Sequence, residues 1–286
     1  MYRCTFLLLV ILLTAILPLN STSAATRMNV VDSSTNVVVY FSPHADDEAL
    51  TFSVPILNDV RSGKKVYLIL MSAGDKSGAR DVVNGMYDEE SRDPALSGQS
   101  LYCKWHQKYH HPAEEGYMDG WLTKEKFGQA RIREFYKSAE AMGIPKDRVK
   151  INLLANEEFT YNSVKSIISL NSRLFPNAQF KSFSAIDGHA DHAMVGRVLN
   201  DMYKQGQIKK PQTNYVSIYT DRFSQMYVPG YKLTLTNSQD LGKLKNALNV
   251  YKTWSPREGF YALGYHSVPV QFDAMENDPY TKVSRY

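Results

Sequence analysis

The sequence predicts an α/β fold with a mainly parallel central sheet, and three observations support this prediction. An apolar, β-branched run at residues 37–41 precedes a helix-compatible stretch, and a second apolar run follows at residues 65–71. The two runs begin about 30 residues apart, an interval that favours a right-handed crossover between parallel strands. With 286 residues, of which 43% are hydrophobic, the chain can bury a full core within one α/β domain.

Each further element is predicted from its local pattern. Residues 48–60 are expected to form a helix that ends near Gly63, with Pro55 as a kink or early break. Residues 124–142 have apolar side chains at helical spacing, and Gly143 is a suitable C-cap. The other predicted strands are residues 149–154, 180–186 and 215–220, and the other predicted helices are residues 163–174, 193–203 and 240–253. The tail beyond these elements has no assignment.

Residues 79–128 form a long aromatic-rich insertion without clear periodicity. Long irregular segments are often functional, and aromatic rings suit the apolar faces of sugars, so this segment is a candidate lid over a binding site. The alternative is an ordered excursion whose aromatic side chains pack onto the body of the protein.

The first residues have the pattern of a secretory signal peptide. Residues 1–25 contain an early arginine, an apolar run at residues 6–17 and then small side chains, so cleavage is expected near Ala24 or Ala25. The run is shorter than the about 20 residues of a membrane span, which makes an uncleaved anchor the less favoured alternative, and no later segment has the composition of a span. We therefore expect a secreted or extracytoplasmic protein in which residues 26–286 form a single domain.

Charge and cysteine content narrow the possible functions. The formal net charge of +4 is mild, and basic residues alternate with acidic ones, so no nucleic-acid partner is expected. Removal of Cys4 with the signal would leave Cys103 as the one mature cysteine, without an intramolecular disulfide. We expect Cys103 to be a buried thiol without a catalytic role. No functional role is predicted for His106, His110, His111 and His266, and the sequence makes no prediction of the oligomeric state.

Two motifs rich in His and Asp each follow a predicted strand. Residues 43–48 read Pro-His-Ala-Asp-Asp-Glu, and residues 187–192 read Asp-Gly-His-Ala-Asp-His. The carboxyl ends of parallel strands lie at one edge of a sheet, where open α/β sheets bind their ligands, so the motifs can converge. Imidazole nitrogens and carboxylate oxygens suit a catalytic zinc, which keeps a fourth position for water. His44, Asp47 and His192 are the candidate ligands for one Zn²⁺ per chain.

The two motifs resemble the paired metal motifs of the PIG-L/LmbE-like zinc-dependent N-acetylglucosaminyl de-N-acetylases. Weaker similarities are present at residues 72–75, 131–134 and in the closing helix, and all the matches follow the family's order over roughly residues 36–254. Residues 79–128 are longer than expected for the family, and the usual Asp-Gly after the third strand is missing. The resemblance implies a Rossmann-like three-layer fold with the metal site at the carboxyl ends of the strands.

The resemblance also implies a metal-dependent amide hydrolase that acts on a linear amide. Zinc would lower the pKa of its bound water toward about 7 and polarise the carbonyl group. Asp46 is the predicted general base. His189, as an imidazolium beside the open metal position, would stabilise the oxyanion or protonate the leaving amine.

Four other residues have two interpretations or rest on the resemblance alone. Arg131 is a candidate for substrate binding, with an ion pair to Glu134 or Asp75 as its alternative. Asp75 is the second candidate for substrate binding. Asp191 either orients His189 or another partner beside the site, or caps a helix. Glu48 either contacts the site or only stabilises the dipole of its helix.

The favoured function is that of an exported zinc hydrolase that removes the N-acetyl group from an N-acetylglucosamine-containing glycan or glycoconjugate. The sugar preference rests on the resemblance, and the chemistry also fits an amidase acting on a non-sugar N-acyl substrate. A non-catalytic carbohydrate-binding protein on the same fold is disfavoured by the intact Asp46. A nucleotide-binding protein is disfavoured because no Gly-x-Gly-x-x-Gly follows the first strand.

Overall fold

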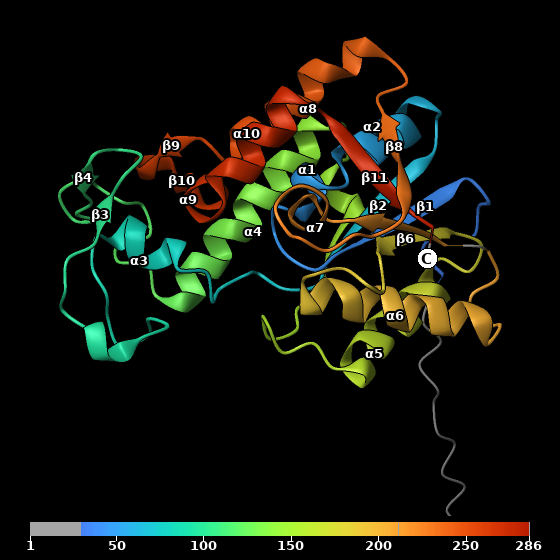
Figure 1. The fold of residues 1–286 in the computed structure, drawn as a ribbon, viewed down its shortest axis with the longest axis horizontal. Coiled ribbons are helices and arrows are strands. Elements are labelled where there is room, and N and C mark those ends of the chain that lie inside the picture. Colours follow the sequence, from blue (N-terminus) through green and yellow to red (C-terminus); the bar gives the residue numbers. More distant parts are fainter. Residues whose placement is uncertain (1–29, 211, 286) are drawn as a thin grey trace, which may run out of the picture.

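The computed structural model describes residues 30–210 and 212–285, and the predicted signal peptide lies outside these residues. A seven-stranded sheet has the order β5-β2-β1-β6-β7-β11-β8 (Figure 1). The first five of these strands are parallel, whereas β11 is antiparallel to both of its neighbours. Their bounds are β1 Val37–Ser42, β2 Lys65–Leu70, β5 Val149–Ile151, β6 Gln179–Phe183, β7 Thr213–Val216, β8 Gly230–Thr234 and β11 Tyr280–Ser284. The predicted α/β class with a mainly parallel sheet is confirmed.

Helices cover both faces of the sheet. Alternate residues of a strand point to opposite faces, so Val38 and Tyr40 pack under one helix layer while Val39 and Phe41 pack under the other. The first layer contains α2 (Ser53–Arg61), α4 (Lys124–Ala141), α8 (Leu241–Val250) and α10 (Pro269–Asn277), and the second contains α5 (Tyr161–Leu174) and α6 (Ala190–Lys204). Figure 1 shows α5 and α6 on the side of the sheet opposite to α4 and α8. This is the three-layer arrangement expected for strands that are apolar on both faces.

Several predicted elements differ from the structure in their bounds. The strands predicted to end at residues 154 and 186 end at Ile151 and Phe183. The predicted helix at residues 48–60 is divided into α1 (Asp47–Leu50) and α2, and the break lies before Pro55. Pro55 occupies the first turn of α2, where a missing N–H costs no helical hydrogen bond. The predicted strand at residues 215–220 ends early, because the Ser217 hydroxyl accepts a hydrogen bond from the backbone N–H of Thr220 and caps α7 (Ile218–Arg222).

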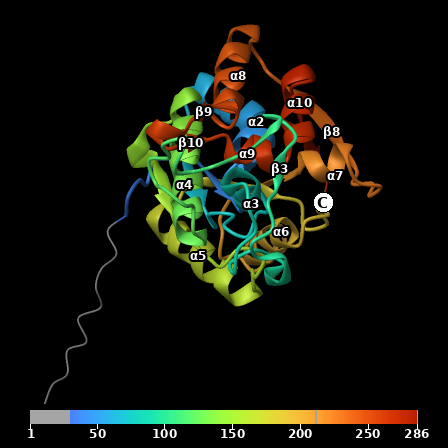
Figure 2. The same ribbon diagram turned by 90° about the vertical axis from the view of Figure 1, so that its left-hand side faces the viewer.

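The aromatic-rich insertion is an ordered excursion with short elements of its own. It contains α3 (Ala79–Asn84), the 3₁₀ turn η1 (Pro94–Leu96) and the hairpin strands β3 (Tyr102–Cys103) and β4 (Lys108–Tyr109). Val83, Tyr117 and Leu122 form a small core with Tyr261 and Leu263 of the C-terminal region. Figure 2 views the molecule from the side on which α3 and β3 lie, close to α9.

The tail that the sequence left unassigned is structured. It forms β9 (Trp254–Ser255), β10 (Phe260–Tyr261), α9 (Leu263–Ser267), α10 and finally β11, which enters the main sheet between β7 and β8. Within the described part of the chain, no helix combines the length and the apolar character that crossing a bilayer requires.

Candidate metal and catalytic site

The two His- and Asp-rich motifs meet at the carboxyl end of the sheet. β1 and β6 are parallel neighbours, so the loop after β1 and the loop before α6 begin side by side. The first loop and the start of α1 carry His44 and Asp47, and the first turn of α6 carries His192. All three side chains are largely buried, with exposed side-chain fractions of 11%, 8% and 7% in that order.

The spacing of the three predicted ligand atoms fits one metal ion. His44 Nδ1 lies 3.2 Å from His192 Nε2. The Asp47 Oδ2 atom lies 3.4 Å from His44 Nδ1 and 3.2 Å from His192 Nε2. In a tetrahedral zinc site with bonds of about 2.0–2.1 Å, neighbouring donor atoms are about 3.3–3.4 Å apart. The donor set and its geometry therefore suit zinc with three protein ligands.

A set of three imidazoles is the geometric alternative. The donor atoms of His44, His189 and His192 all lie within 4.8 Å of one another. The Asp47 oxygen lies 3.2 and 3.4 Å from the His192 and His44 donor atoms, which is the separation that a tetrahedral site requires. His189 Nδ1 is already engaged, since it accepts a hydrogen bond from the backbone N–H of Asp191. We therefore place Asp47 in the ligand set and His189 beside it.

A carboxylate faces the far nitrogen of each ligand histidine. Asp191 Oδ2 lies 3.1 Å from His44 Nε2, and Asp187 Oδ1 lies 3.3 Å from His192 Nδ1. Such carboxylates fix the tautomer and orientation of metal-binding histidines. Asp191 therefore orients His44, and the helix-cap alternative is wrong because His189 is the N-cap of α6.

Sequence reasoning missed the role of Asp187. Its carboxylate is fixed by hydrogen bonds from the backbone N–H and hydroxyl of Ser217 and from the hydroxyl of Thr220, at 2.8 to 2.9 Å. Its position five residues before His192 was the available signal. This spacing alone does not show whether the carboxylate is buried beside the histidine or exposed in a turn. The answer depends on the hydrogen-bond donors at the start of α7, which lie about 30 residues further along the chain.

The charges in this pocket favour a cation. Burial disfavours the imidazolium of His192, but the carboxylates of Asp47 and Asp187 outweigh this effect and raise the pKa of His192 to about 10. Burial alone would raise the pKa of Asp47, but His192 and His44 outweigh burial and hold this pKa well below the usual range. A divalent cation and protons would therefore compete for the same positions.

Asp46 is held at the edge of the cleft by neighbouring groups. Its carboxylate accepts a hydrogen bond of 2.8 Å from Arg131, whose guanidinium also donates to the carbonyl of Ala45. The backbone N–H of Asp46 donates to Glu48 at 3.1 Å, and Glu48 also accepts a hydrogen bond from the Tyr251 hydroxyl at 2.7 Å. The Asp46 backbone has a φ of 141°, which is uncommon for a residue other than glycine. These contacts stabilise a strained position from which the carboxylate borders the cleft.

The same contacts settle the partners of Arg131 and Glu48. Arg131 is buried and pairs with Asp46, so the predicted pairing with Glu134 or Asp75 is wrong. Glu48 lies in the first turn of α1, as the dipole interpretation requires, but it also holds the backbone of Asp46. Burial raises the pKa of Glu48 to about 8 and also raises that of Asp46, although Arg131 opposes the second shift.

His189 is arranged as a neutral hydrogen-bond donor. Because Nδ1 accepts from the backbone of Asp191, its hydrogen is on Nε2. Burial and the nearby His192 and His44 lower the pKa of His189 to about 4. The imidazolium predicted from the sequence is therefore not the form that this environment favours, whereas stabilisation of an oxyanion by an N–H donor remains possible.

These groups line a cleft of about 490 Å³. Its lining includes His44, Asp46, Asp47, Arg131, His189 and His192. Asp75 instead lines an adjoining hollow of about 240 Å³ that shares Ser77 and Arg92 with the cleft, and this predicted substrate-binding residue does not line the cleft itself. Among the residues of the excursion, Ala79, Val82 and Arg92 reach the cleft, whereas its aromatic side chains do not line it.

Comparison with known proteins gives a family match and several similar folds. The family described as GlcNAc-PI de-N-acetylase (PIG-L) matches residues 39–203. No curated protein matches the chain.

Three solved structures illustrate the structural similarity. The N,N'-diacetylchitobiose deacetylase from Pyrococcus horikoshii is 14% identical, with a TM-score of 0.50 over 87% of this chain and 83% of the other. A zinc-inhibited form of teicoplanin deacetylase is 12% identical, with a TM-score of 0.51 over 86% and 96%. The 4-carboxy-2-hydroxymuconate hydratase of Pseudomonas putida is 12% identical, with a TM-score of 0.51 over 87% and 95%. Since the third protein is a hydratase, the fold alone does not determine the reaction.

Proposed function

Because the chain is an amide hydrolase of the GlcNAc-PI de-N-acetylase (PIG-L) family, we propose that it removes the N-acetyl group from an N-acetylglucosamine-containing glycan or glycoconjugate. One zinc ion would assist the reaction. The observation that carries this proposal is the set of three donor atoms 3.2 to 3.4 Å apart, with Asp46 adjacent to them in sequence and in the cleft. The sugar substrate is supported by two structurally similar proteins, the N,N'-diacetylchitobiose deacetylase and the teicoplanin deacetylase.

His44, Asp47 and His192 would hold the ion. When bound, zinc acidifies water and polarises a carbonyl group. Asp187 and Asp191 keep the two imidazoles in the tautomers that present a lone pair to the ion. The buried carboxylates around the site compensate its positive charge.

The remaining residues have roles in moving protons and stabilising charge. Asp46 takes a proton from the attacking water, and Arg131 fixes the position of its carboxylate. His189 donates a hydrogen bond from Nε2 to the substrate carbonyl oxygen as negative charge develops there. Asp46 then returns its proton to the amine that leaves.

Export is a separate part of the proposal and rests on residues 1–25, whose pattern is that of a secretory signal. Mass spectrometry of the protein from the medium of a secreting host should find a new amino terminus at Ala25 or Thr26. An intact Met1 on protein that stays in the cell would contradict export.

The main test is release of free amine from a panel of N-acetylglucosamine compounds. The panel contains the monosaccharide, chitooligosaccharides, peptidoglycan fragments and an inositol-linked glycoconjugate, and each is assayed with chelator and with added zinc. Release that a chelator abolishes and zinc restores supports the proposal. If only a non-sugar N-acyl compound is cleaved, the amidase alternative is correct, and binding without cleavage would indicate the carbohydrate-binding protein.

Asp46→Asn tests the predicted base. This variant should lose about 10²- to 10⁴-fold in kcat while it keeps its zinc, because the ligands remain. Asp75→Asn is the matched control and should keep near-normal activity, since Asp75 does not line the cleft. Loss of zinc from Asp46→Asn, or normal turnover by it, would show that Asp46 and Asp47 have been assigned the wrong roles.

A further inference from the structure

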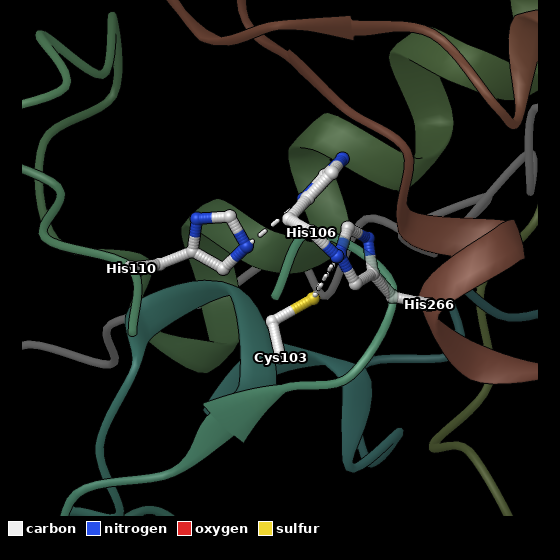
Figure 3. Close-up of side chains that lie close together, drawn as sticks. All are labelled: Cys103, His106, His110 and His266. Carbon is white, nitrogen blue, oxygen red and sulfur yellow. Dashed lines mark hydrogen bonds between the residues drawn. The ribbon is translucent and has the colours of Figure 1, made fainter. Parts of the chain in front are cut away.

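A second group of metal-ligand side chains lies outside the catalytic cleft. Cys103 ends β3, His106 lies in the turn between β3 and β4, and His110 directly follows β4. His266 comes from α9, far away in the sequence. Figure 3 shows the four side chains converging from the hairpin and from the helix.

The donor atoms are as close as ligands of one ion would be. Cys103 Sγ lies 3.4 Å from His266 Nε2, and His106 Nδ1 lies 3.1 Å from His110 Nε2. One donor atom from each of the four residues lies within 4.8 Å of all the others. In a tetrahedral zinc site with one sulfur and three nitrogen ligands, donor atoms are about 3.3–3.6 Å apart. A small contraction around an ion would complete such a tetrahedron.

Two of the imidazoles are already oriented by outer partners. His266 Nδ1 faces the carbonyl of Ala262 at 2.9 Å, and His110 Nδ1 faces a carboxylate oxygen of Glu115 at 3.0 Å. Both acceptors place the ring hydrogen on Nδ1, so both Nε2 lone pairs point to the centre of the cluster. A carbonyl or a carboxylate behind a ligand histidine is the usual arrangement in metal sites. The backbone N–H of His106 donates to Cys103 Sγ at 3.3 Å, so the sulfur atom is also fixed in position.

Two residues of the cluster are fully buried, and His106 and His266 are half-buried. Cys103 and His110 are each 1% exposed. Trp105 packs on His106 with ring centroids 4.2 Å apart, and Trp254 packs on His110 at 4.4 Å. Four protein donors around one point leave no open position, as in structural rather than catalytic zinc sites. The combination of a thiolate and imidazoles selects zinc over magnesium or calcium.

We propose that Cys103, His106, His110 and His266 bind a second Zn²⁺, a structural ion that ties the β3–β4 hairpin to α9. The sequence had predicted one zinc per chain and no role for these four residues. His266 and Ser267 of α9 also line the catalytic cleft. The second ion therefore holds one wall of the cleft in place.

The first test is the zinc content of the purified full-length protein after dialysis. Wild type should hold two zinc ions per chain, and Cys103→Ala and His110→Ala should each hold one. His192→Ala should lose the other ion, so a failure of the catalytic site and a failure of the second site are distinguishable. His111→Ala is the matched control, because this exposed histidine lies beside His110 and should keep both ions. If Cys103→Ala and His110→Ala bind as much zinc as wild type, the proposal is wrong.

Cobalt substitution tests the sulfur ligand without relying on the folding of a variant. Wild-type protein loaded with Co²⁺ should show a thiolate-to-cobalt charge-transfer band, and His192→Ala should retain it. Cys103→Ser should lose the band. Its absence from the wild-type protein would overturn the proposal, and the four side chains would then be joined to one another only by hydrogen bonds, from the Cys103 thiol to His266 and between His106 and His110.

Discussion

At the scale of single residues, the proposed catalytic ligands depend on the carboxylates behind them. His44 could bind a cation through either nitrogen, and Asp191 fixes this choice by facing Nε2 at 3.1 Å. Asp191 is itself fixed by the backbone N–H of Glu157 at 2.9 Å. A residue without any direct contact with the ion is therefore expected to influence its affinity.

Asp191→Asn isolates this electrostatic contribution. The asparagine oxygen can still accept from Glu157, but the negative charge opposite His44 is lost, so zinc affinity should fall about 10- to 100-fold. Titration with a competing chelator measures this change, and Asp75→Asn serves as the control. An unchanged affinity in Asp191→Asn would mean that the carboxylate only holds the adjacent loop.

The sequence was sufficient for residues that lie within a motif and insufficient for those that meet across the fold. The different roles predicted for Asp46 and Asp47 rest on their place in a short motif after a strand and on the family resemblance, and they stay a prediction. The pairing of Arg131 with Asp46 joins α4 to the β1 loop, and the contact of Cys103 with His266 joins the excursion to α9. No local pattern encodes either pairing, because each depends on how helices pack against the sheet.

At the scale of elements, α6 approaches β6 unusually closely at Gly196. A Cβ atom at this position would lie 2.3 Å from the carbonyl oxygen of Phe183. The ring of Phe183 stacks on His192, with centroids 3.9 Å apart. The same close approach therefore positions both the helix and the imidazole at its first turn.

Gly196→Ala should push α6 away from the strand. We expect the free energy of unfolding to fall by about 1–3 kcal/mol, as for other overpacked cores, and zinc affinity to fall with it. Urea unfolding and chelator titration measure the two effects. Gly242→Ala in α8 is the matched control, because no atom lies within 4 Å of a Cβ there, and it should not destabilise the protein. Normal zinc binding by Gly196→Ala would show that the position of α6 does not determine the geometry of the metal site.

The elements themselves were predictable where the pattern is local. The β-branched runs predicted β1 and β2, and helical spacing predicted α4. β11 was missed because its five residues form a strand only by pairing with β7 and β8, which precede it in the chain. The early end of the strand before α7 depends on a hydroxyl cap at Ser217 that an alternating pattern does not reveal.

At the scale of the whole molecule, a buried ion pair joins the sheet to a helix layer. Asp59 of α2 accepts from Lys181 of β6 at 2.6 Å and from the hydroxyl of Tyr40 of β1 at 2.6 Å. Both charged side chains are 8% exposed. Removing one partner of such a pair leaves an uncompensated charge in the core.

Asp59→Ala should therefore lower the free energy of unfolding by about 3–5 kcal/mol. The double variant with Lys181→Met should recover much of this loss, because no charge is then left buried alone. Denaturant unfolding of the three proteins measures both steps. If the double variant is as unstable as the single one, the loss reflects packing rather than the unpaired ammonium.

The same pair predicts a dependence of stability on acid. Burial alone would raise the pKa of Asp59, but Lys181 outweighs it and holds the pKa below the usual value. The folded state thus binds fewer protons than the unfolded state, so this stabilisation is complete above about pH 4 and is lost as the pH falls through the folded-state pKa. Wild type should lose stability in this range more steeply than the double variant, and equal slopes would contradict the prediction.

The position of β11 between β7 and β8 has a consequence for synthesis of the chain. On the ribosome, the strands and loops that carry the catalytic motifs emerge first, and β8 emerges without a strand to pair with. Until residues 280–284 follow, β7 also presents an unpaired edge, which is open to pairing with other nascent chains. The growing polypeptide, rather than the finished enzyme, is therefore the form most exposed to aggregation and most dependent on chaperones.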